Sequence, residues 1–368
     1  RFPRRCHHRG LGSSSPREGK RTSFTVLNYN ILCSRYATKE LYNYCPNWAL
    51  DWSYRRKAIL AELLHYSPDI ISLQELETDQ FYNFFLPQLQ LMGYSGIFGA
   101  KSRARTMSEE EEGGGWMVAM RMANQKREEG QEEMLNRVQT KDNIALAALF
   151  ETKVDSEQSS TFHGLVASKP RPLLVCTCHI HWDPNYCDVK LVQTMMLMQE
   201  LSKISDNISH LEPEKRIPSS CSSSSSTSCS SPSPTPSTTT SLDSNVNLLI
   251  CGDFNSLPSS GVVQFMESGS IPPSTPDFKG LSYQSYMDSS SSHKFHLKSA
   301  YPASSLPFTN YTLDFQGVID YIFHSASGLR LSASSALWTP AGSSLTTWLE
   351  LRTLPFRVTT FPFSSSWR

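Results

Sequence analysis

Short apolar runs alternate along the chain with stretches of helical hydrophobic spacing, and this pattern predicts a mixed α/β protein. Strands are expected where residues alternate or run apolar, at 23–32, 70–75, 94–98, 143–150, 173–179, 248–251 and 316–323. Helices are expected at 52–66, 79–92, 191–204 and 261–266. Strands and helices in alternation, with polar residues at strand ends, indicate an α/β sandwich with a site at one edge of its sheets.

Three stretches depart from this pattern and suggest the domain organisation. Residues 1–22 are basic and rich in Ser and Gly, and we expect a disordered leader that is not a secretory signal, because it lacks an apolar core. Residues 205–244 include a long tract of Ser, Thr and Pro and are expected to be a disordered insertion. One folded domain is expected over 23–330, followed by a divergent tail at 331–368.

Composition narrows the classes of function. The 368 residues are 39% hydrophobic and 18% charged, so a globular core is expected. The formal net charge is zero, so any nucleic-acid site must be a local patch. The nine cysteines lack metal-finger spacing and favour a reducing compartment, and no apolar run approaches the length of a membrane span.

One apolar run leads directly into polar residues that suggest chemistry. Residues 248–251 are followed by Gly-Asp-Phe-Asn, so Asp253 and Asn255 are two residues apart and point to one side of the strand end. A carboxylate and a carboxamide are the hard oxygen ligands that Mg²⁺ prefers. The alternative is a Gly-Asp turn with an Asx cap after a core strand.

Four other strands end in, or carry, a polar residue: Asn30, Glu75, His179 and Asp320. Three have ordinary structural explanations, as a turn residue, a helix N-terminal charge and a hydrogen-bonded strand histidine respectively. Asp320 is harder to explain in that way, because it lies inside an apolar run and a buried carboxylate needs a partner.

Taken together, the motifs around these residues resemble the endonuclease/exonuclease/phosphatase superfamily from about residue 23 to about residue 325. The Glu75 and Asp253/Asn255 motifs belong to the whole superfamily, whereas residues 44–50 and 101–105 resemble its Ccr–Not deadenylase branch. The segments that carry the resemblance are 24–32, 42–50, 69–75, 101–105, 135–143, 179–184, 188–191, 252–258, 310–312 and 317–323.

The resemblance implies a fold and a reaction. The fold would be a four-layer α/β/β/α sandwich with the active site at one end. The reaction would be magnesium-dependent 3′-to-5′ hydrolysis of poly(A) tails with release of AMP, using two Mg²⁺ ions or Mn²⁺ in their place. The partners would be poly(A) RNA and Ccr–Not subunits, without a membrane, in the cytoplasm and nucleus.

The resemblance also implies a role for each site residue. Asp253 would position or deprotonate the attacking water, Asn255 would assist it, and His179 would hydrogen-bond the scissile phosphate. Asp320 would orient a second histidine. The metal set would be Glu75, Asn30, Asp253 and Asn255. The substrate-binding residues would be Asn30, His179, Pro184, Asn255 and Phe315. Among them, Phe315 and Pro184 would stack on an adenine.

The chain departs from the family pattern in three places. First, residues 115–121 stand in place of a family strand and either pair as that strand or leave it missing. Second, a Ser tract replaces a family loop, which costs little free energy because loop-closure entropy rises slowly with loop length. The family's terminal Ser-Asp-His does not occur, and the only histidine after Asp320 is His324. At about 3.3 Å per residue, His324 lies about 13 Å along the strand and cannot bond Asp320.

These departures leave three hypotheses open. The first is an active poly(A) exonuclease. The second is a catalytically impaired relative that keeps the RNA-binding groove, because the terminal histidine and its strand are expected to be lost. The third is a phosphodiesterase of the superfamily acting on another ester, against which the deadenylase-branch motifs argue. The leucine-rich repeats that precede the family's domain and dock a second nuclease are also not found in this sequence.

Overall fold

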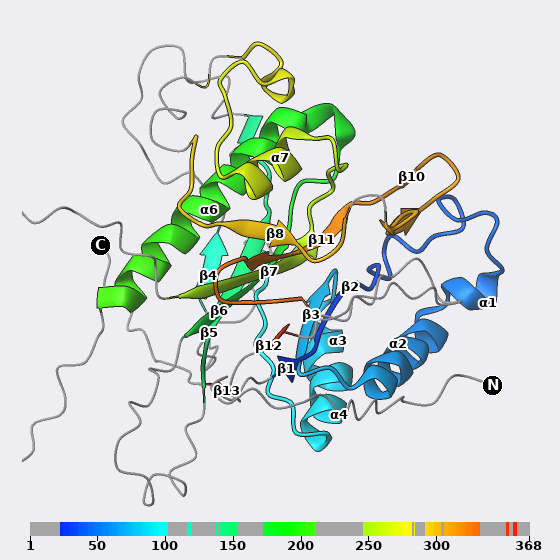
Figure 1. The fold of residues 1–368 in the computed structure, drawn as a ribbon. Coiled ribbons are helices and arrows are strands. Elements are labelled where there is room, and N and C mark those ends of the chain that lie inside the picture. The colour runs from blue at the N-terminus through cyan, green and yellow to red at the C-terminus, as the bar shows by residue number, and fades with distance from the viewer. Residues whose placement is uncertain are drawn as a thin grey trace, which may run out of the picture.

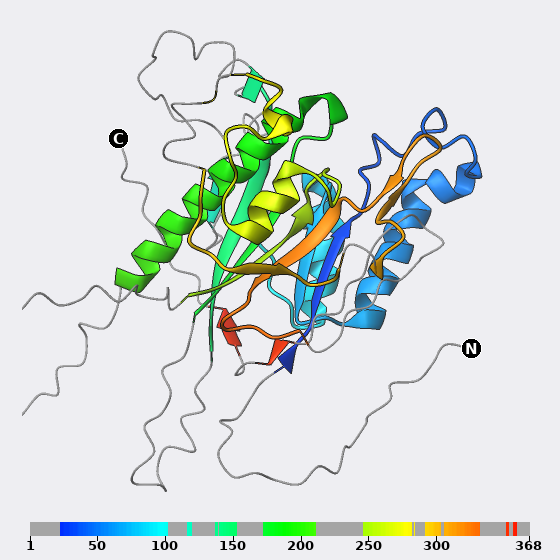
Figure 2. The ribbon, with the colours of Figure 1, turned by 45° about the horizontal axis from the view of Figure 1, so that its top comes forward.

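Two β-sheets lie face to face at the centre of the molecule, and helices cover the outside of each (Figures 1 and 2). The structure is a computed structural model. It describes residues 23–101, 116–119, 137–138, 140–152, 172–210, 246–281, 283, 291–302, 305–331, 351–352 and 356–358. The α/β/β/α order of the layers confirms the predicted fold class.

The larger sheet has seven strands in the described residues and brings three expected site strands together. Its order is β13 (Phe356–Val358), β5 (Ile144–Thr152), β6 (Leu173–His179), β7 (Asn247–Asp253), β11 (Asp320–Ser325) and β8 (Leu297–Ser299), with β4 (Trp116–Ala119) also paired to β5. Strands β6 and β7 are parallel and pair His179 with Asp253, whereas β11 is antiparallel to β7 and pairs Asp320 with Asp253. Three polar residues therefore lie in one row at one edge of the sheet.

The smaller sheet consists of the parallel strands β2 (Val26–Asn30) and β3 (Ile70–Gln74). Its side chains alternate between two environments, as the pleat requires. One face packs on α2 (Trp52–Tyr66) and α4 (Leu86–Leu91), and its core contains Leu27, Tyr29, Ile31, Ile59, Leu63, Phe85 and Leu89. The other face meets the larger sheet and ends at Asn30 and Gln74, so Glu75 follows directly at the same edge.

A layer of buried polar side chains joins the two sheets. Ser72 Oγ donates to Thr177 Oγ1 at 2.8 Å, and Gln74 Nε2 donates to the same oxygen at 2.9 Å. Asn28 Oδ1 accepts from Gln74 Nε2 at 2.9 Å. Hydrogen bonds have directional geometry, so this layer fixes how one sheet sits on the other.

Two helices cover the opposite face of the larger sheet, α6 (Cys187–His210) and α7 (Gly261–Ser268) (Figure 2). The main apolar core lies between them and the sheet, where α6 contributes seven fully buried apolar side chains: Val189, Leu191, Val192, Met195, Leu197, Met198 and Leu201. Ser260 caps α7 by accepting from Val263 N, and Gly269 ends it at φ 79°.

Shorter elements complete the described fold. The strand pairs are β1 (Ser23–Phe24) with β12 (Leu351–Arg352), and β9 (Asn310–Tyr311) with β10 (Gln316–Gly317). The remaining helical pieces are α1 (Asn47–Leu50), α3 (Thr78–Gln80), a π-helical turn at Phe81–Phe85, and 3₁₀ turns at Pro184–Tyr186 and Pro276–Phe278. No helix in this part of the chain combines the length and the apolar character that a membrane crossing requires.

Several expected boundaries differ from the structure. Residues 94–98 form no strand, and 316–323 is divided between β10 and β11. Helix α6 continues through residues 205–210, where Ser209 Oγ donates to the Ser205 carbonyl, so the expected insertion begins too early. Residues 1–22 and 211–244 lie outside the described residues.

The tail contributes two short strands. β12 and β13 fall within residues 331–368 and pair with β1 and β5, while the loss of the family's terminal strand stays a prediction. Residues 116–119 pair with β5, which resolves the open question of whether that stretch forms a strand. Both β4 and β13 therefore protect the free edge of β5.

Candidate active site

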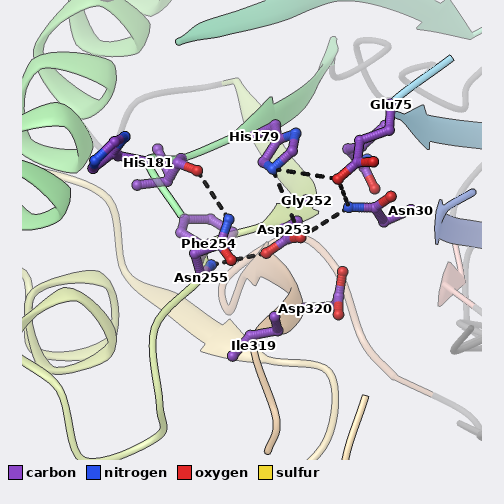
Figure 3. A network of polar contacts seen from close by, with 12 residues as sticks. Asn30, Glu75, His179, His181, Gly252, Asp253, Phe254, Asn255, Ile319 and Asp320 are labelled. Atoms are coloured by element: carbon purple, nitrogen blue, oxygen red, sulfur yellow. Dashed lines mark hydrogen bonds and ion pairs between the residues drawn. The ribbon is translucent and has the colours of Figure 1, made fainter. Parts of the chain in front are cut away.

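The amide of Asn30 joins two carboxylates that come from different sheets (Figure 3). Asn30 Nδ2 donates to Glu75 Oε1 at 3.0 Å and to Asp253 Oδ2 at 2.9 Å. Asn30 ends β2, Glu75 follows β3, and Asp253 ends β7. The structure thus brings Asn30 together with Glu75 and Asp253, which lie 45 and 223 positions further along the sequence.

His179 lies at ion-pair distance from both carboxylates of this acidic cluster, without a hydrogen bond to either (Figure 3). Its Nε2 is 4.0 Å from Glu75 Oε1 and 3.8 Å from Asp253 Oδ2. Asn143 Nδ2 donates to the His179 carbonyl at 2.9 Å and fixes the backbone at the end of β6. The imidazole therefore faces the space between the carboxylates, where a substrate oxygen could be placed.

The backbone around the cluster adopts left-handed conformations that side chains seldom take. Leu32 has φ 54°, Glu75 has φ 61° and Asn255 has φ 49°. Cys33 N donates to Glu75 Oε2 at 2.8 Å, and Leu32 N donates to Asn30 Oδ1 at 3.0 Å, so the turn after β2 wraps around the carboxylate. Strained backbone of this kind concentrates at functional sites. The role of Cys33 was not predicted, because no sequence pattern marks a backbone donor.

Asp253 is held on both of its oxygens. Asn255 N donates to Oδ1 at 2.9 Å, which leaves Oδ2 directed at Asn30. Asn255 Nδ2 donates to the Ile180 carbonyl at 3.0 Å, so its side chain bridges β6 and β7. Burial raises the pKa of Asp253 above its ordinary value, although His179 and the Asn30 hydrogen bond oppose the shift.

Asp320 is buried beside Asp253 with only half of its carboxylate satisfied. Thr309 Oγ1 donates to Oδ2 at 2.6 Å, while Oδ1 has no hydrogen-bond partner among the described residues. Burial, reinforced by the charge of Asp253, raises the pKa of Asp320 well above its ordinary value. Thr309 was not predicted as a site residue, although it directly precedes the 310–312 motif.

Three described histidines, His324, His296 and His181, have no hydrogen bond to Asp320 that would replace its missing partner. His324 stands four residues along β11, and its Nδ1 lies 3.3 Å from the Ser325 carbonyl. His296 is exposed, and its carbonyl accepts from Ala326 N, beyond the far end of β11. His181 packs against Tyr186, and its Nε2 is buried without a partner in this part of the structure.

The two residues expected to stack on adenine lie outside the acidic cluster. Pro184 is exposed and begins the 3₁₀ turn after β6. Phe315 is 38% exposed in the β9–β10 hairpin, whose first strand follows Thr309. Their stacking role stays a prediction.

The donor set suits a magnesium ion better than a zinc-type site. Among the described residues no three His, Cys, Asp or Glu side chains converge as a metal site. Magnesium, however, is usually held by one or two carboxylates and keeps several waters. Glu75 and Asp253, with the amides of Asn30 and Asn255 beside them, fit that requirement.

Comparisons with known proteins identify the family and the fold. The family model described as "Endonuclease/Exonuclease/phosphatase family" matches residues 27–155 and 235–359. Among solved structures, ANGEL2, a 2′,3′-cyclic phosphatase, in complex with adenosine-2′,3′-vanadate has TM-score 0.63 and 20% identity, covering 90% of this chain and 96% of that one. The human Nocturnin catalytic domain has TM-score 0.51 and 19% identity, covering 92% and 95%.

Curated relatives are more similar in sequence. "CCR4-NOT transcription complex subunit 6-like" of Danio rerio is 43% identical over 341 residues, covering 84% of this chain and 56% of the relative. "CCR4-Not complex 3'-5'-exoribonuclease subunit Ccr4" of Schizosaccharomyces pombe is 38% identical over 334 residues, covering 85% and 44%. The chain thus spans about half the length of these relatives. The family model matches most of the chain, and the acidic cluster lies at one edge of the sheets. The chain therefore belongs to the endonuclease/exonuclease/phosphatase family.

Proposed function

We propose that the chain is a magnesium-dependent 3′-to-5′ exoribonuclease that shortens poly(A) tails and releases AMP. The observation that carries the proposal is the Asn30 amide, which draws Glu75 and Asp253 together beside His179. Relatives named 3′-5′ exoribonuclease subunits of the CCR4-Not complex support the same choice. By that likeness we also propose Ccr–Not subunits as partners and the cytoplasm and nucleus as its location.

The proposed mechanism assigns one task to each residue. Magnesium held at Glu75, with Asn30 beside it, would lower the pKa of the attacking water and neutralise charge on the phosphate; two ions, or Mn²⁺, fit the same oxygen donors. Asp253 would orient that water and accept its proton through Oδ2, the oxygen that faces Asn30 and His179.

The remaining groups would bind the substrate. His179 Nε2 would donate a hydrogen bond to the scissile phosphate, where negative charge develops in the transition state. The exposed faces of Phe315 and Pro184 would stack on the adenine, and preference for adenine would need further contacts to the base edge.

The test is the turnover of a 5′-labelled A20 oligonucleotide with magnesium or with chelator. Wild-type protein is expected to shorten it stepwise from the 3′ end, and Glu75→Gln to lower the rate by about a few powers of ten. Glu200→Gln, an exposed acid on α6, serves as the control and should retain the wild-type rate. Full activity of Glu75→Gln, or activity in chelator, contradicts the metal assignment, and equal turnover of a U20 oligonucleotide contradicts poly(A) preference.

A second candidate function is an RNA-binding relative with impaired chemistry. The observation that favours it is Asp320, whose Oδ1 has no partner in the described structure while the sequence contains no Ser-Asp-His. Replacing residues 331–368 with a family-type tail that ends in Ser-Asp-His tests it. If turnover rises by orders of magnitude while RNA affinity stays constant, the native chain is impaired; if turnover is unchanged, another group orients the substrate.

A further inference from the structure

Two buried cations stand directly behind the left-handed turns of the site. Arg55 extends from α2 beneath the smaller sheet, and Lys190 extends from the first turn of α6 beneath the larger one. They are only 2% and 6% exposed. Burying a charge costs a large free energy unless the group is paired or hydrogen-bonded, so the contacts of these two side chains indicate why they are buried.

Arg55 secures the turn that wraps around Glu75. Its Nη2 donates to the carbonyls of Ile31 at 2.5 Å and Leu32 at 2.6 Å. Leu32 is the residue at φ 54°, and the next amide, Cys33 N, holds Glu75 Oε2 at 2.8 Å. Releasing the two carbonyls would therefore free the amide that orients the carboxylate.

Lys190 secures the corresponding turn in the other sheet. Its Nζ donates to the Asn255 carbonyl at 2.6 Å. Asn255 is at φ 49°, and its own amide holds Asp253 Oδ1 at 2.9 Å. The same arrangement thus occurs twice: a buried cation holds the carbonyl of a left-handed residue, and a backbone amide in that turn holds a carboxylate of the site.

We propose that Arg55 and Lys190 are a pair of positioning residues that keep the two turns closed and so fix Glu75 and Asp253 at their meeting point. A neutral donor could hold a carbonyl, but a cation also offsets the repulsion between neighbouring carboxylates. Arg55 is attracted to Glu75, and Lys190 to Asp253. In the described structure both cations donate to backbone carbonyls and neither hydrogen-bonds a carboxylate, which leaves the carboxylate oxygens available for substrate and metal.

The test uses Arg55→Met and Lys190→Met, with the charge-conserving Arg55→Lys and Lys190→Arg. Hydrogen–deuterium exchange is followed in peptides covering residues 30–36 and 253–258, which contain the Cys33 and Asn255 amides. We expect about tenfold faster exchange of the first peptide alone in Arg55→Met and of the second alone in Lys190→Met. Lys190→Arg should restore slow exchange, whereas Arg55→Lys should do so only in part, because an ammonium lacks the planar fork of a guanidinium.

The controls are Leu63→Ala on α2 and Met198→Ala on α6, which remove buried apolar side chains from the same helices. They should lower the unfolding temperature without selective exchange at either turn. If the Met variants match these controls, with a lower unfolding temperature and no local exchange, the two cations are merely structural and the inference is overturned.

The kinetic part of the test rests on the proposed function. In the Met variants we expect kcat for A20 to fall about 10- to 100-fold while KM changes less than about threefold, since Phe315, Pro184 and His179 keep their positions. If wild-type protein does not degrade A20, the proposed function is refuted. The exchange experiment would still decide whether Arg55 and Lys190 hold the two turns closed. Selective exchange together with an unchanged kcat would overturn the positioning role.

Discussion

Replacing Asp320 by asparagine should stabilise the protein at neutral pH. The carboxylate is 8% exposed, accepts one hydrogen bond from Thr309, leaves Oδ1 without a described partner and pairs across the sheet with Asp253. An incompletely satisfied buried group costs about 1–3 kcal/mol, and more when it is charged. Asparagine keeps the shape and removes the charge, so the free energy of unfolding should rise by about 1–3 kcal/mol at pH 8.

The sign of the pH dependence follows from the pKa of Asp320, which is raised in the folded state above an unfolded value of about 3.9. The folded state therefore binds the proton more strongly, and wild-type stability falls as pH rises from about 4 through the raised pKa. Asp320→Asn lacks this titration. The stability difference between variant and wild type should be small near pH 4 and increase toward pH 8.

Urea unfolding in chelator at pH 4.5, 6 and 8 measures this difference. Asp314→Asn, an exposed acid in the neighbouring hairpin, is the matched control and should change stability by less than about 0.5 kcal/mol at each pH. A variant that is less stable than wild type at pH 8 would refute the reasoning, because the carboxylate would then have a stabilising partner. Magnesium should reduce the gain, since the cation stabilises the wild-type charge.

Two further changes test the packing around the site. Gly252→Ala should lower the free energy of unfolding by about 1–3 kcal/mol in urea, because its Cβ would lie 2.3 Å from the Cys178 carbonyl oxygen; unchanged stability would contradict that close approach. His181 has its pKa lowered to about 4 by burial and then by Lys141, so stability should be lost as pH falls from about 6.5 toward 4. At 1.36 kcal/mol per pKa unit the loss in the free energy of unfolding is at most about 3 kcal/mol, and screening by nearby solvent reduces it to about 1–2 kcal/mol. In His181→Asn the free energy of unfolding should therefore depend less on pH between about 4 and 6.5.

The strand-end residues could be predicted because their signals are local. A continuous apolar run followed by Gly-Asp-Phe-Asn predicts both the burial of β7 and a turn after it, in which Asn255 N donates to Asp253 Oδ1. Glu75 was equally visible after a five-residue strand. Strand direction also implies that His179 and Asp253 lie close together, since the parallel strands β6 and β7 end at the same edge of the sheet.

Other features depend on tertiary contacts and were missed for that reason. Residues 94–98 have the composition of a strand, but they take an irregular path on which Phe98 stacks against Phe81 with ring centroids 4.9 Å apart. Helix α6 extends to His210 because Ile204 and Ile208 still pack on the core. Periodicity could not show that Asn30 bonds two carboxylates, because the second lies in another sheet.

The position of Asn30 makes the site depend on how the two sheets meet. An apolar interface between sheets would allow small shifts at little cost, because van der Waals contacts are non-directional. Here the interface carries the Ser72, Gln74 and Thr177 hydrogen bonds, each 2.8 to 2.9 Å long, close to the edge where Asn30 meets Asp253. A one-residue slip would place buried polar groups against apolar ones and leave them unsatisfied. The polar layer therefore contributes little net stability but selects one sheet arrangement, the one in which the acids of both sheets share the Asn30 amide.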